Sequence, residues 1–396
     1  MRMNILVMSL LLGLCHPMFA ADDAARWREL SAGRDAYRKA LDQVRSEYGG
    51  AYKLPAVDFF LFGMGNRNKY LYVKGQLRDA LTNHVVRTWQ VTEELIVPPS
   101  YTVALKTEDG KTVFVFEDES AVWVEADGKK DALSKGNVNL PDFKGRKHQL
   151  VLRVLHQELL VNVVNGRPVP NFFVYSKPWY RDGAMMAMAF KKTANLHIIK
   201  DWILGLREPY DRNNAGETEA DNLGEVLYLI SLVSDKSHPL VPIVQAEFLR
   251  FQKDQWIEGR SDFAARPVYQ TKWAKFGLRS LGLNDPYTVP RTKDYYAALF
   301  WLAYKADDMP DQPIEENDKY PYLGWASCHY AGTKKGCKLS DRDYPLTWEA
   351  QASQANYDGI KQIGPEFAEG KICAPHTWHA AEAFLYLIEE PKEEPK

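Results

Sequence analysis

The chain has 396 residues, of which 45% are hydrophobic, and a formal net charge of -2. This length can bury a large core and predicts about two domains. The balanced charge excludes the strongly basic surface that nucleic-acid binding requires, so no nucleic-acid partner is predicted.

The first twenty residues have the pattern of a secretory signal peptide. Met1-Arg2 gives a positive start, residues 5–14 are apolar, and the small residues Ala20-Ala21 offer a cleavage site. The apolar run is too short to cross a bilayer and no other stretch is apolar enough, so no membrane span is predicted. We therefore expect a periplasmic or secreted protein, cleaved near Ala20 or Ala21. A lipid anchor on Cys15 is the alternative.

Three cysteines remain when Cys15 is removed with the signal peptide. In an oxidising compartment Cys328 and Cys337 can close a short loop as a disulfide, which leaves Cys373 unpaired. The alternative is a zinc site of these three cysteines with His376, because Cys373-x-x-His376 has ligand-like spacing. We predict the disulfide and no metal centre.

Residues 22–50 are predicted to form an N-terminal helix, since apolar residues recur at helical spacing until Gly49-Gly50 ends the pattern. Residues 51–168 then change period, and short β-branched and aromatic runs alternate with turn signals such as Asp109-Gly110. We predict a small antiparallel β-domain here. Its last hairpin is expected over residues 149–164.

From residue 171 to about residue 390 the apolar residues recur at helical spacing. Sequential helical hairpins joined by short turns predict an all-α, (α/α)-toroid-like domain. Together with the β-domain, this gives an α+β multidomain fold. A long irregular loop is expected over residues 307–346. Helices are predicted over residues 222–233, 240–253, 268–281, 293–305, 349–360 and 377–389.

Acidic residues cluster where several of these helices are expected to begin. Glu219 and Asp221 precede one helix, Glu349 follows Trp348 at a second, and Asp182 follows Arg181 at a third. Neighbouring carboxylates at a helix start interact with the dipole and with one another, which can push one of them towards the neutral form. Plain helix capping is the alternative for each. A fourth cluster, Glu258 and Asp262, is interpreted as part of a solvated loop.

Large aromatic residues accompany these acids. Indole rings stack on the apolar faces of sugars, and we expect two or three of the tryptophans in loops or at helix starts to face a ligand. His376, beside Trp378, is a further candidate for binding. The tryptophans in such positions are Trp179, Trp256, Trp325, Trp348 and Trp378.

Residues 178–184 and 377–387, which open and close the helical part after a β-domain, resemble the six-hairpin glycosidases. These are the glucoamylase-like (α/α) toroid enzymes, and the resemblance extends over residues 171–388. The β-domain and the helical part are both shorter than in that group. The resemblance implies inverting hydrolysis by two carboxyl groups, which stand about 6.5–9.5 Å apart in such sites. It also implies that Arg181 and Asp182 clamp sugar hydroxyls.

The sequence thus predicts a secreted glycoside hydrolase with a carbohydrate substrate. Glu219 is assigned as general acid, Glu349 as general base and Asp221 as the group that tunes the acid. The sequence contains no phosphate-binding loop, nucleophile elbow or His-Glu-x-x-His helix, and no cofactor is predicted. The substrate is expected to contact Trp179, Arg181, Asp182, Trp256, Trp348, His376 and Trp378.

Two alternatives remain open. The first is a polysaccharide lyase on the same scaffold, with Tyr330 or His329 as base and with Arg181 and Asn222 neutralising a uronate. The second is a glycan-binding or scaffold protein without catalysis, in which the tryptophans face outward and the acids cap helices. The discriminating feature is whether two carboxylates or a Tyr/His/Arg set share one cavity.

Overall fold

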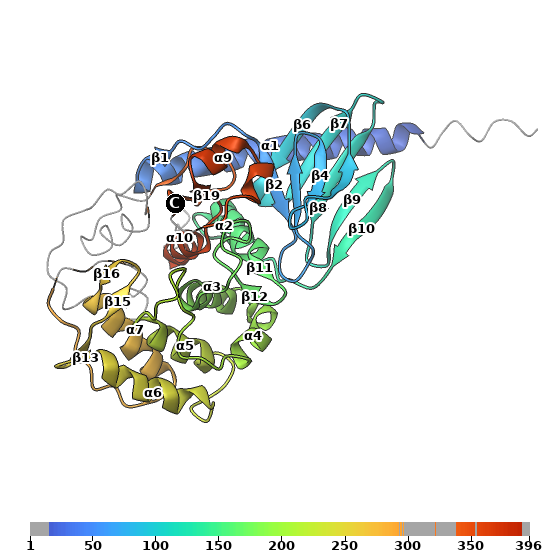
Figure 1. Cartoon of the computed structure of the whole chain (residues 1–396). Coiled ribbons are helices and arrows are strands. Elements are labelled where there is room, and N and C mark those ends of the chain that lie inside the picture. The colour runs from blue at the N-terminus through green and yellow to red at the C-terminus, as the bar shows by residue number, and fades with distance from the viewer. Residues whose placement is uncertain are drawn as a thin grey trace, which may run out of the picture.

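The structure, a computed structural model, describes residues 16–292, 294, 296, 321, 338–352 and 355–389, with side chains described from residue 22. It is an α+β protein in which antiparallel sheets lie beside a group of helices (Figure 1). Among the described helices, none is both long and apolar enough to cross a membrane. The signal peptide lies mostly outside these residues and stays a prediction.

The long first helix, α1 (His16–Tyr48), covers most of the predicted N-terminal helix but begins earlier. Tyr37, Leu41, Val44 and Tyr48 are fully buried, and their spacing of three and four residues places them on one face. Further towards its N-terminus, α1 packs Trp27 against a small apolar cluster on the five-stranded sheet. The helix is therefore fixed to the body of the protein along much of its length.

Two antiparallel meanders form the β-rich part. The first has the strand order β2-β3-β4-β5, with bounds Phe59–Phe62, Tyr70–Val73, Gln76–Asp79 and Val85–Thr88. The second has the order β10-β9-β8-β7-β6. Its strands, β6 to β10, are Val91–Val97, Thr102–Thr107, Thr112–Glu117, Ala121–Ala126 and Lys129–Lys135, with the 3-10 turn η1 (Pro98–Ser100) after β6.

Strands β7 and β8, inside the five-stranded sheet, are largely buried on both faces. Val103 and Leu105 belong to the main core, whereas Ala104 between them belongs to the cluster under α1. Ala104 pairs with Phe114 of β8, and Phe114 also faces α1. This period-two alternation is why the segment forms strands, and the turn predicted at Asp109-Gly110 joins β7 to β8 as expected.

The hairpin predicted over residues 149–164 is wrong. Helix α2 (Gln149–Val161) occupies most of this segment, and only β11 (Val163–Val164) and β12 (Arg167–Pro168) form a short hairpin. Many β-branched residues suggested strands, but buried Val151, Leu155 and Leu159 recur at four-residue steps. The helical period decides the structure because it places these residues on one buried face.

The remaining helices and short strands follow in chain order. Three of the predicted helices, over residues 222–233, 240–253 and 377–389, correspond closely to α5, α6 and α10, and residues 268–281 correspond to α7. The bounds are α3 (Tyr180–Lys192), η2 (Leu196–Ile198), α4 (Lys200–Leu204), α5 (Asn222–Ser231), α6 (Leu240–Phe251), β13 (Gln252–Lys253), β14 (Trp256–Ile257), β15 (Arg260–Ser261), β16 (Ala264–Ala265), α7 (Pro267–Ser280), η4 (Ile360–Gln362), α9 (Pro365–Glu369) and α10 (Thr377–Glu389).

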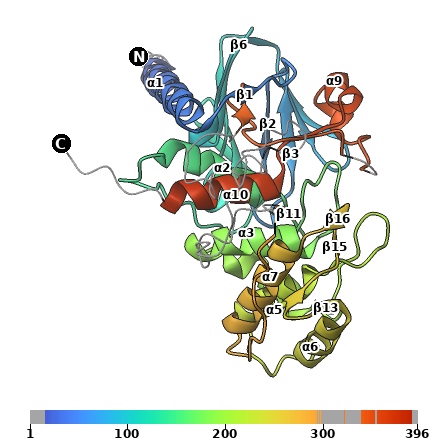
Figure 2. The same ribbon diagram turned by 90° about the vertical axis from the view of Figure 1, so that its left-hand side faces the viewer.

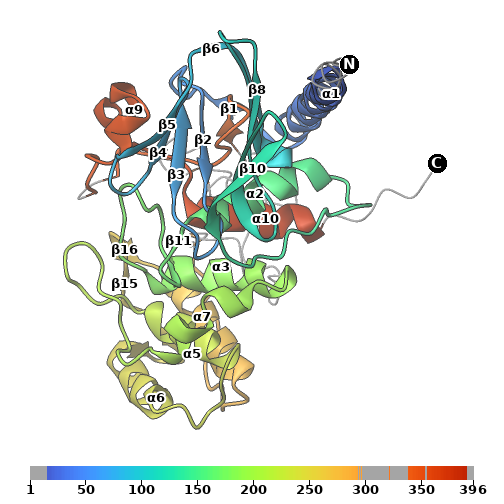
Figure 3. The same ribbon diagram turned by 90° about the vertical axis from the view of Figure 1, so that its right-hand side faces the viewer.

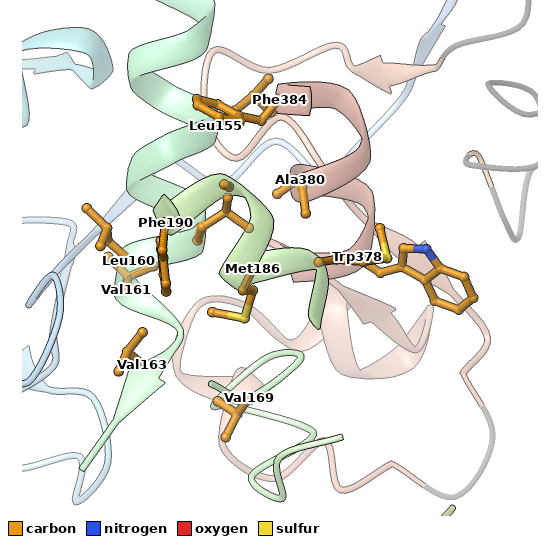
Figure 4. Packing of buried hydrophobic residues seen from close by; sticks show 14 of the residues in the cluster. Leu155, Leu160, Val161, Val163, Val169, Met186, Phe190, Trp378, Ala380 and Phe384 are labelled. Carbon is orange, nitrogen blue, oxygen red and sulfur yellow. The ribbon is translucent and has the colours of Figure 1, made fainter. Parts of the chain in front are cut away.

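Helix α10 lies between α2 and α3, although it comes from the far end of the chain (Figure 2). Its Ala380 and Phe384 meet Leu155 of α2 and Met186 and Phe190 of α3 in one apolar cluster (Figure 4). On its other side α3 packs against α5, and α5 packs against α7. Figure 3 shows α5, α6 and α7 together at the end of the molecule away from the sheets.

Two short strand pairs organise the C-terminal part, and the first of them joins it to the beginning of the β-rich part. Strand β17 (Leu339–Ser340) pairs in parallel with β1 (Ala51–Tyr52), and β18 (Glu349–Ala350) pairs with β19 (Ile372–Cys373). The helix predicted over residues 349–360 is wrong, because the described residues there form β18 and loop before η4. Most of the helix predicted over residues 293–305 and most of the loop predicted over residues 307–346 lie outside the described residues, as do Trp325, Cys328 and Cys337.

Candidate functional site

A cavity of about 210 Å³ lies where four chain segments meet. These segments are the start of α3, the loop that leads into α5, the β15–β16 hairpin, and β18 with the start of α10. Seven of the ten residues predicted for the site line it: Trp179, Arg181, Asp182, Glu219, Glu349, His376 and Trp378.

Arg181 is the centre of the site. Its guanidinium contacts Glu219, donates to Asp221 at 3.1 Å and donates to Asp262 at 3.0 Å. It also lies over the Trp378 ring, with 4.6 Å between its Cζ atom and the ring centroid. Since the side chain is buried, these charge-assisted bonds replace the water that the guanidinium loses on folding. Asp221, predicted to tune the acid, therefore lies behind Arg181 and does not line the cavity.

Glu219 is surrounded by other acids. Burial raises the pKa of Glu219 to about 7; Arg181 opposes the rise, while Asp221 and Asp262 add to it. One guanidinium serves three carboxylates here, so retaining a proton on Glu219 relieves their mutual repulsion. The Asn213 side-chain amide, at 3.0 Å, and the Asp262 backbone N–H, at 2.9 Å, both donate to the Oε1 atom of Glu219.

Glu349 has a different environment. The pairing of β18 with β19 sets it opposite Cys373, and its Oε2 atom lies 3.0 Å from Nε2 of His376. Burial works against a charge on His376, but the hydrogen bond and charge of Glu349, with Asp182 and Asp262, raise the pKa of His376 overall. Glu349 was expected at a helix start; the strand pair is what brings it to the cavity.

Two more acids line the cavity, of which Asp182 is buried and Asp211 is partly buried. Burial raises the pKa of Asp182, whose Oδ1 atom accepts a hydrogen bond from the Thr377 hydroxyl at 2.9 Å. Burial likewise raises the pKa of Asp211 to about 7, although the Tyr180 backbone N–H donates to it. The predicted Arg181–Asp182 clamp is therefore divided: Asp182 is held by the start of α10, and Arg181 by the acid cluster.

The β15–β16 hairpin supplies a residue that sequence reasoning placed in a solvated loop. Asp262 stands at the hairpin tip and contacts both Arg181 and Tyr296. Gln270 of α7 fixes the hairpin, since its side-chain amide bonds to Gly259 in both directions and donates to the Ser261 hydroxyl at 2.8 Å. The turn residues Asp262-Phe263 are not the Asn-Gly or Asp-Gly pair that marks a two-residue hairpin, so the sequence held no local signal for this turn.

Aromatic side chains form much of the remaining wall. Trp179 packs at 5.0 Å, centroid to centroid, from Tyr175, and Trp378 packs at 5.3 Å from Tyr296. Trp378 is only 4% exposed, and Phe263 on the hairpin is 57% exposed. Tyr175 and Phe263 were not among the predicted site residues. The cavity thus runs from a buried indole to an exposed ring at its rim.

Two predicted stacking tryptophans lie elsewhere. Trp348 is fully buried and stacks on Tyr52 at 3.5 Å, so its indole belongs to the core. Trp256 lies on β14 outside the cavity lining, and its indole N–H donates to Glu258 at 3.0 Å. The expectation that they contact a ligand in this cavity does not fit these positions. Loop location suggested exposure, but the short strand pairs turn these residues away.

The residues of the alternative readings are only partly described. His329 and Tyr330 lie outside the described residues, and Asn222 lines the cavity while its amide donates to Glu225 at 3.0 Å. Cys373 is buried and free. Within the described ranges no group of three or more His, Cys, Asp or Glu side chains is arranged to hold a metal ion.

The charges of the lining are unequal. Five carboxylates line the cavity: Asp182, Asp211, Glu219, Asp262 and Glu349. Against them stand Arg181, Arg260 and His376, and Arg260 forms an ion pair with Glu217. The described lining therefore favours a neutral or cationic ligand over an anionic one.

No protein-family model, curated protein or solved structure matches the chain.

Proposed function

We propose that the chain is a glycoside hydrolase that cleaves an oligo- or polysaccharide by inverting, two-carboxylate chemistry. The observation that carries the proposal is that Glu219 and Glu349 line one aromatic-walled cavity in contrasting environments. Pairs of carboxyl groups whose surroundings separate their protonation states are the usual basis of general acid and general base catalysis.

Glu219 is the better general acid. Its raised pKa, to about 7, keeps a proton available near neutral pH for the departing glycosidic oxygen. Glu349 is then the base: it takes a proton from a water molecule as that water attacks the anomeric carbon from the opposite face. His376, bonded to Glu349 through Nε2, orients the carboxylate. The leaving sugar departs with the proton from Glu219, and the configuration at the anomeric carbon inverts.

The arrangement of helices supports a toroid-like domain of the six-hairpin type. The neighbouring helices α10, α3 and α5 all begin beside the cavity, at His376–Trp378, Trp179–Asp182 and Glu219–Asn222. Helix N-termini that converge on one cavity are what an inner ring of parallel helices produces. The sugar is expected to lie against Trp179 and Trp378, with Asp182 and Asn214 within reach of its hydroxyls.

A lyase fits this lining less well. A polysaccharide lyase needs a cation to neutralise the uronate carboxylate, and Arg181 is already engaged by three carboxylates. Any uronate in the cavity would also meet five lining acids. Neutral sugars avoid this repulsion, so we expect cleavage of a neutral or amine-bearing glycan.

The test measures reducing ends released from a panel of neutral, amine-bearing and uronate polysaccharides. On the cleaved substrate, Glu219→Gln and Glu349→Gln should each lower kcat by about 10²–10⁴-fold with an unchanged circular dichroism spectrum. Glu258→Gln is the matched control, because this acid lies on the neighbouring hairpin and bonds to Trp256 outside the cavity. Nuclear magnetic resonance of the first product anomer reports the stereochemistry.

Near-normal kcat in Glu219→Gln or Glu349→Gln would remove that residue from the mechanism. An unsaturated product from a uronate polymer would replace hydrolysis by elimination. Glycan binding without cleavage across the panel would instead favour a non-catalytic protein.

A further inference from the structure

We infer that Phe263, at the tip of the β15–β16 hairpin, forms a second sugar-binding subsite at the rim of the cavity, which makes the protein prefer longer saccharide chains. This inference rests on the proposed function, because it assigns a position to the part of the substrate that the cavity does not hold. Phe263 is neither one of the two proposed catalytic acids nor one of the tryptophans predicted from the sequence.

The size of the cavity calls for such a subsite. Sites that enclose a whole drug-sized ligand usually have about 300–1,000 Å³, whereas this cavity has about 210 Å³. A chain of several sugars therefore places only part of itself beside Glu219 and Glu349. The next sugar has to lie across the rim, and Phe263 belongs to the lining there.

Phe263 has the exposure of a binding surface rather than of a core residue. It is 57% exposed, although large apolar side chains on a hairpin tip lose free energy in water. A sugar presents an apolar C–H face and can cover such a ring while its hydroxyls remain in water. A bound sugar would remove from water the part of the Phe263 ring that stays exposed after folding, and burying this apolar surface favours binding.

The ring is also held in place, which lowers the entropy cost of binding. The Arg266 guanidinium lies 5.0 Å from the Phe263 ring centroid and 4.7 Å from that of Tyr296. Tyr296 in turn contacts Asp262 and accepts a hydrogen bond from Arg181 at 3.1 Å. Phe263 is thus connected through packed side chains to the same acid cluster that surrounds Glu219, and a pre-positioned ring loses little freedom on binding.

The backbone separates the roles of two neighbouring residues. Asp262 takes a left-handed conformation, with φ of 52°, and its carboxylate bonds to Arg181. Phe263 follows it at the turn and is exposed at the rim. Because only Asp262 bonds to Arg181, Phe263 can be replaced with the Arg181–Asp262 ion pair left in place.

The experiment compares the wild type with Phe263→Ala on ladders of malto-, cello-, xylo- and chito-oligosaccharides of increasing length. Loss of one aromatic contact should lower kcat/KM for the longer members about threefold to tenfold and leave the disaccharide unchanged. Phe263→Trp should restore the length preference. Leu249→Ala is the matched control, since Leu249 is an apolar residue of α6 that is 71% exposed and outside the cavity lining.

An equal loss at every length, or no loss at any length, would overturn the subsite. Dissociation constants measured in parallel for the same oligosaccharides distinguish a failure of the subsite from a failure of the proposed hydrolysis. If the wild type binds a ladder without cleaving it, and Phe263→Ala weakens only the longer members, the subsite stands and hydrolysis fails. If the wild type neither binds nor cleaves any ladder, both are overturned.

Discussion

Arg181 organises the candidate site through the geometry of its guanidinium. Three separate nitrogen atoms contact Glu219, Asp221 and Asp262, and the plane lies over Trp378. A lysine ammonium has one nitrogen and could not hold three carboxylates apart in this way. The three acids are therefore presented at fixed positions. Burial, with the added negative charge of Asp221 and Asp262, is what raises the pKa of Glu219.

Glu158 of α2 is a second buried acid with consequences for stability. The Leu346 backbone N–H and the Thr347 hydroxyl each donate to it at 2.5 Å, and burial raises its pKa from 4.5 to about 8. Because the folded pKa is raised, the stabilising contribution is fully present below about pH 4.5 and is lost as the pH rises through about 8.

The glutamine of Glu158→Gln cannot ionise. As the pH rises from about 4.5 to about 8, the free energy of unfolding of this variant should therefore fall less than that of the wild type. The difference should be on the order of a few kcal/mol and is measured by urea unfolding at both ends of the window. Exposed Glu93→Gln serves as the control and should follow the wild-type profile. Parallel profiles for Glu158→Gln and the wild type would show that Glu158 does not titrate in this way.

At the scale of the element, helical segments with clear apolar spacing could be predicted and the short strand pairs could not. Helices α5, α6, α7 and α10 have buried residues at three- and four-residue steps, which is a local signal. Strands of two residues, such as β18 and β19, carry no period, and their pairing joins residues more than twenty positions apart. For this reason the acids were identified but Glu349 was assigned to a helix.

The same limit explains the site residues that were misplaced or missed. An indole in a loop was expected at a surface, and only the contact with Tyr52, far away in sequence, places Trp348 in the core. Asp262 was interpreted as solvated because its partner, Arg181, is 81 positions away. Residue types indicated the chemistry, whereas non-local pairing selected which residues share the cavity.

The crossing of α5 and α7 depends on glycine. A Cβ atom at Gly224 would lie 2.2 Å from the backbone carbonyl carbon of Trp273, and one at Gly277 would lie 2.4 Å from the Gly224 carbonyl oxygen. Backbone cannot retreat as a flexible side chain can. Gly224→Ala should therefore lower the free energy of unfolding by about 1–3 kcal/mol, although alanine is the better helix former.

Gly33→Ala in α1 is the natural comparison, because no atom lies within 4 Å of a Cβ atom built there. That substitution should raise the free energy of unfolding by about 0.5–1 kcal/mol. Denaturant unfolding of both variants gives the sign of each change. A stabilised Gly224→Ala would mean that α5 and α7 do not approach so closely.

At the scale of the whole molecule, the sheets and helices share one core. A single apolar cluster includes Phe60 and Leu71 of the four-stranded sheet, Leu155 of α2, Ile230 of α5 and Phe384 of α10. The sequence predicted separate β and helical domains because the apolar period changes between them. Helix α2, in the segment where the sequence predicted a β-hairpin, is the element that joins the two parts.

A shared core predicts cooperative unfolding. Differential scanning calorimetry of the protein should give one transition, because exposing the sheet side of the core also exposes α2 and α10. The calorimetric enthalpy should equal the van't Hoff enthalpy. Two resolved transitions would indicate that the sheets and helices unfold as separate domains.

The position of α10 has a consequence for the order in which the chain can be completed. Residues 377–389 fill the space between α2 and α3, which are made about two hundred positions earlier. During synthesis the apolar faces of α2 and α3 therefore stay uncovered until α10 emerges, about two hundred residues later. This interval is when a partly made chain is most open to aggregation and to chaperones, and a truncation before residue 377 would make that state permanent.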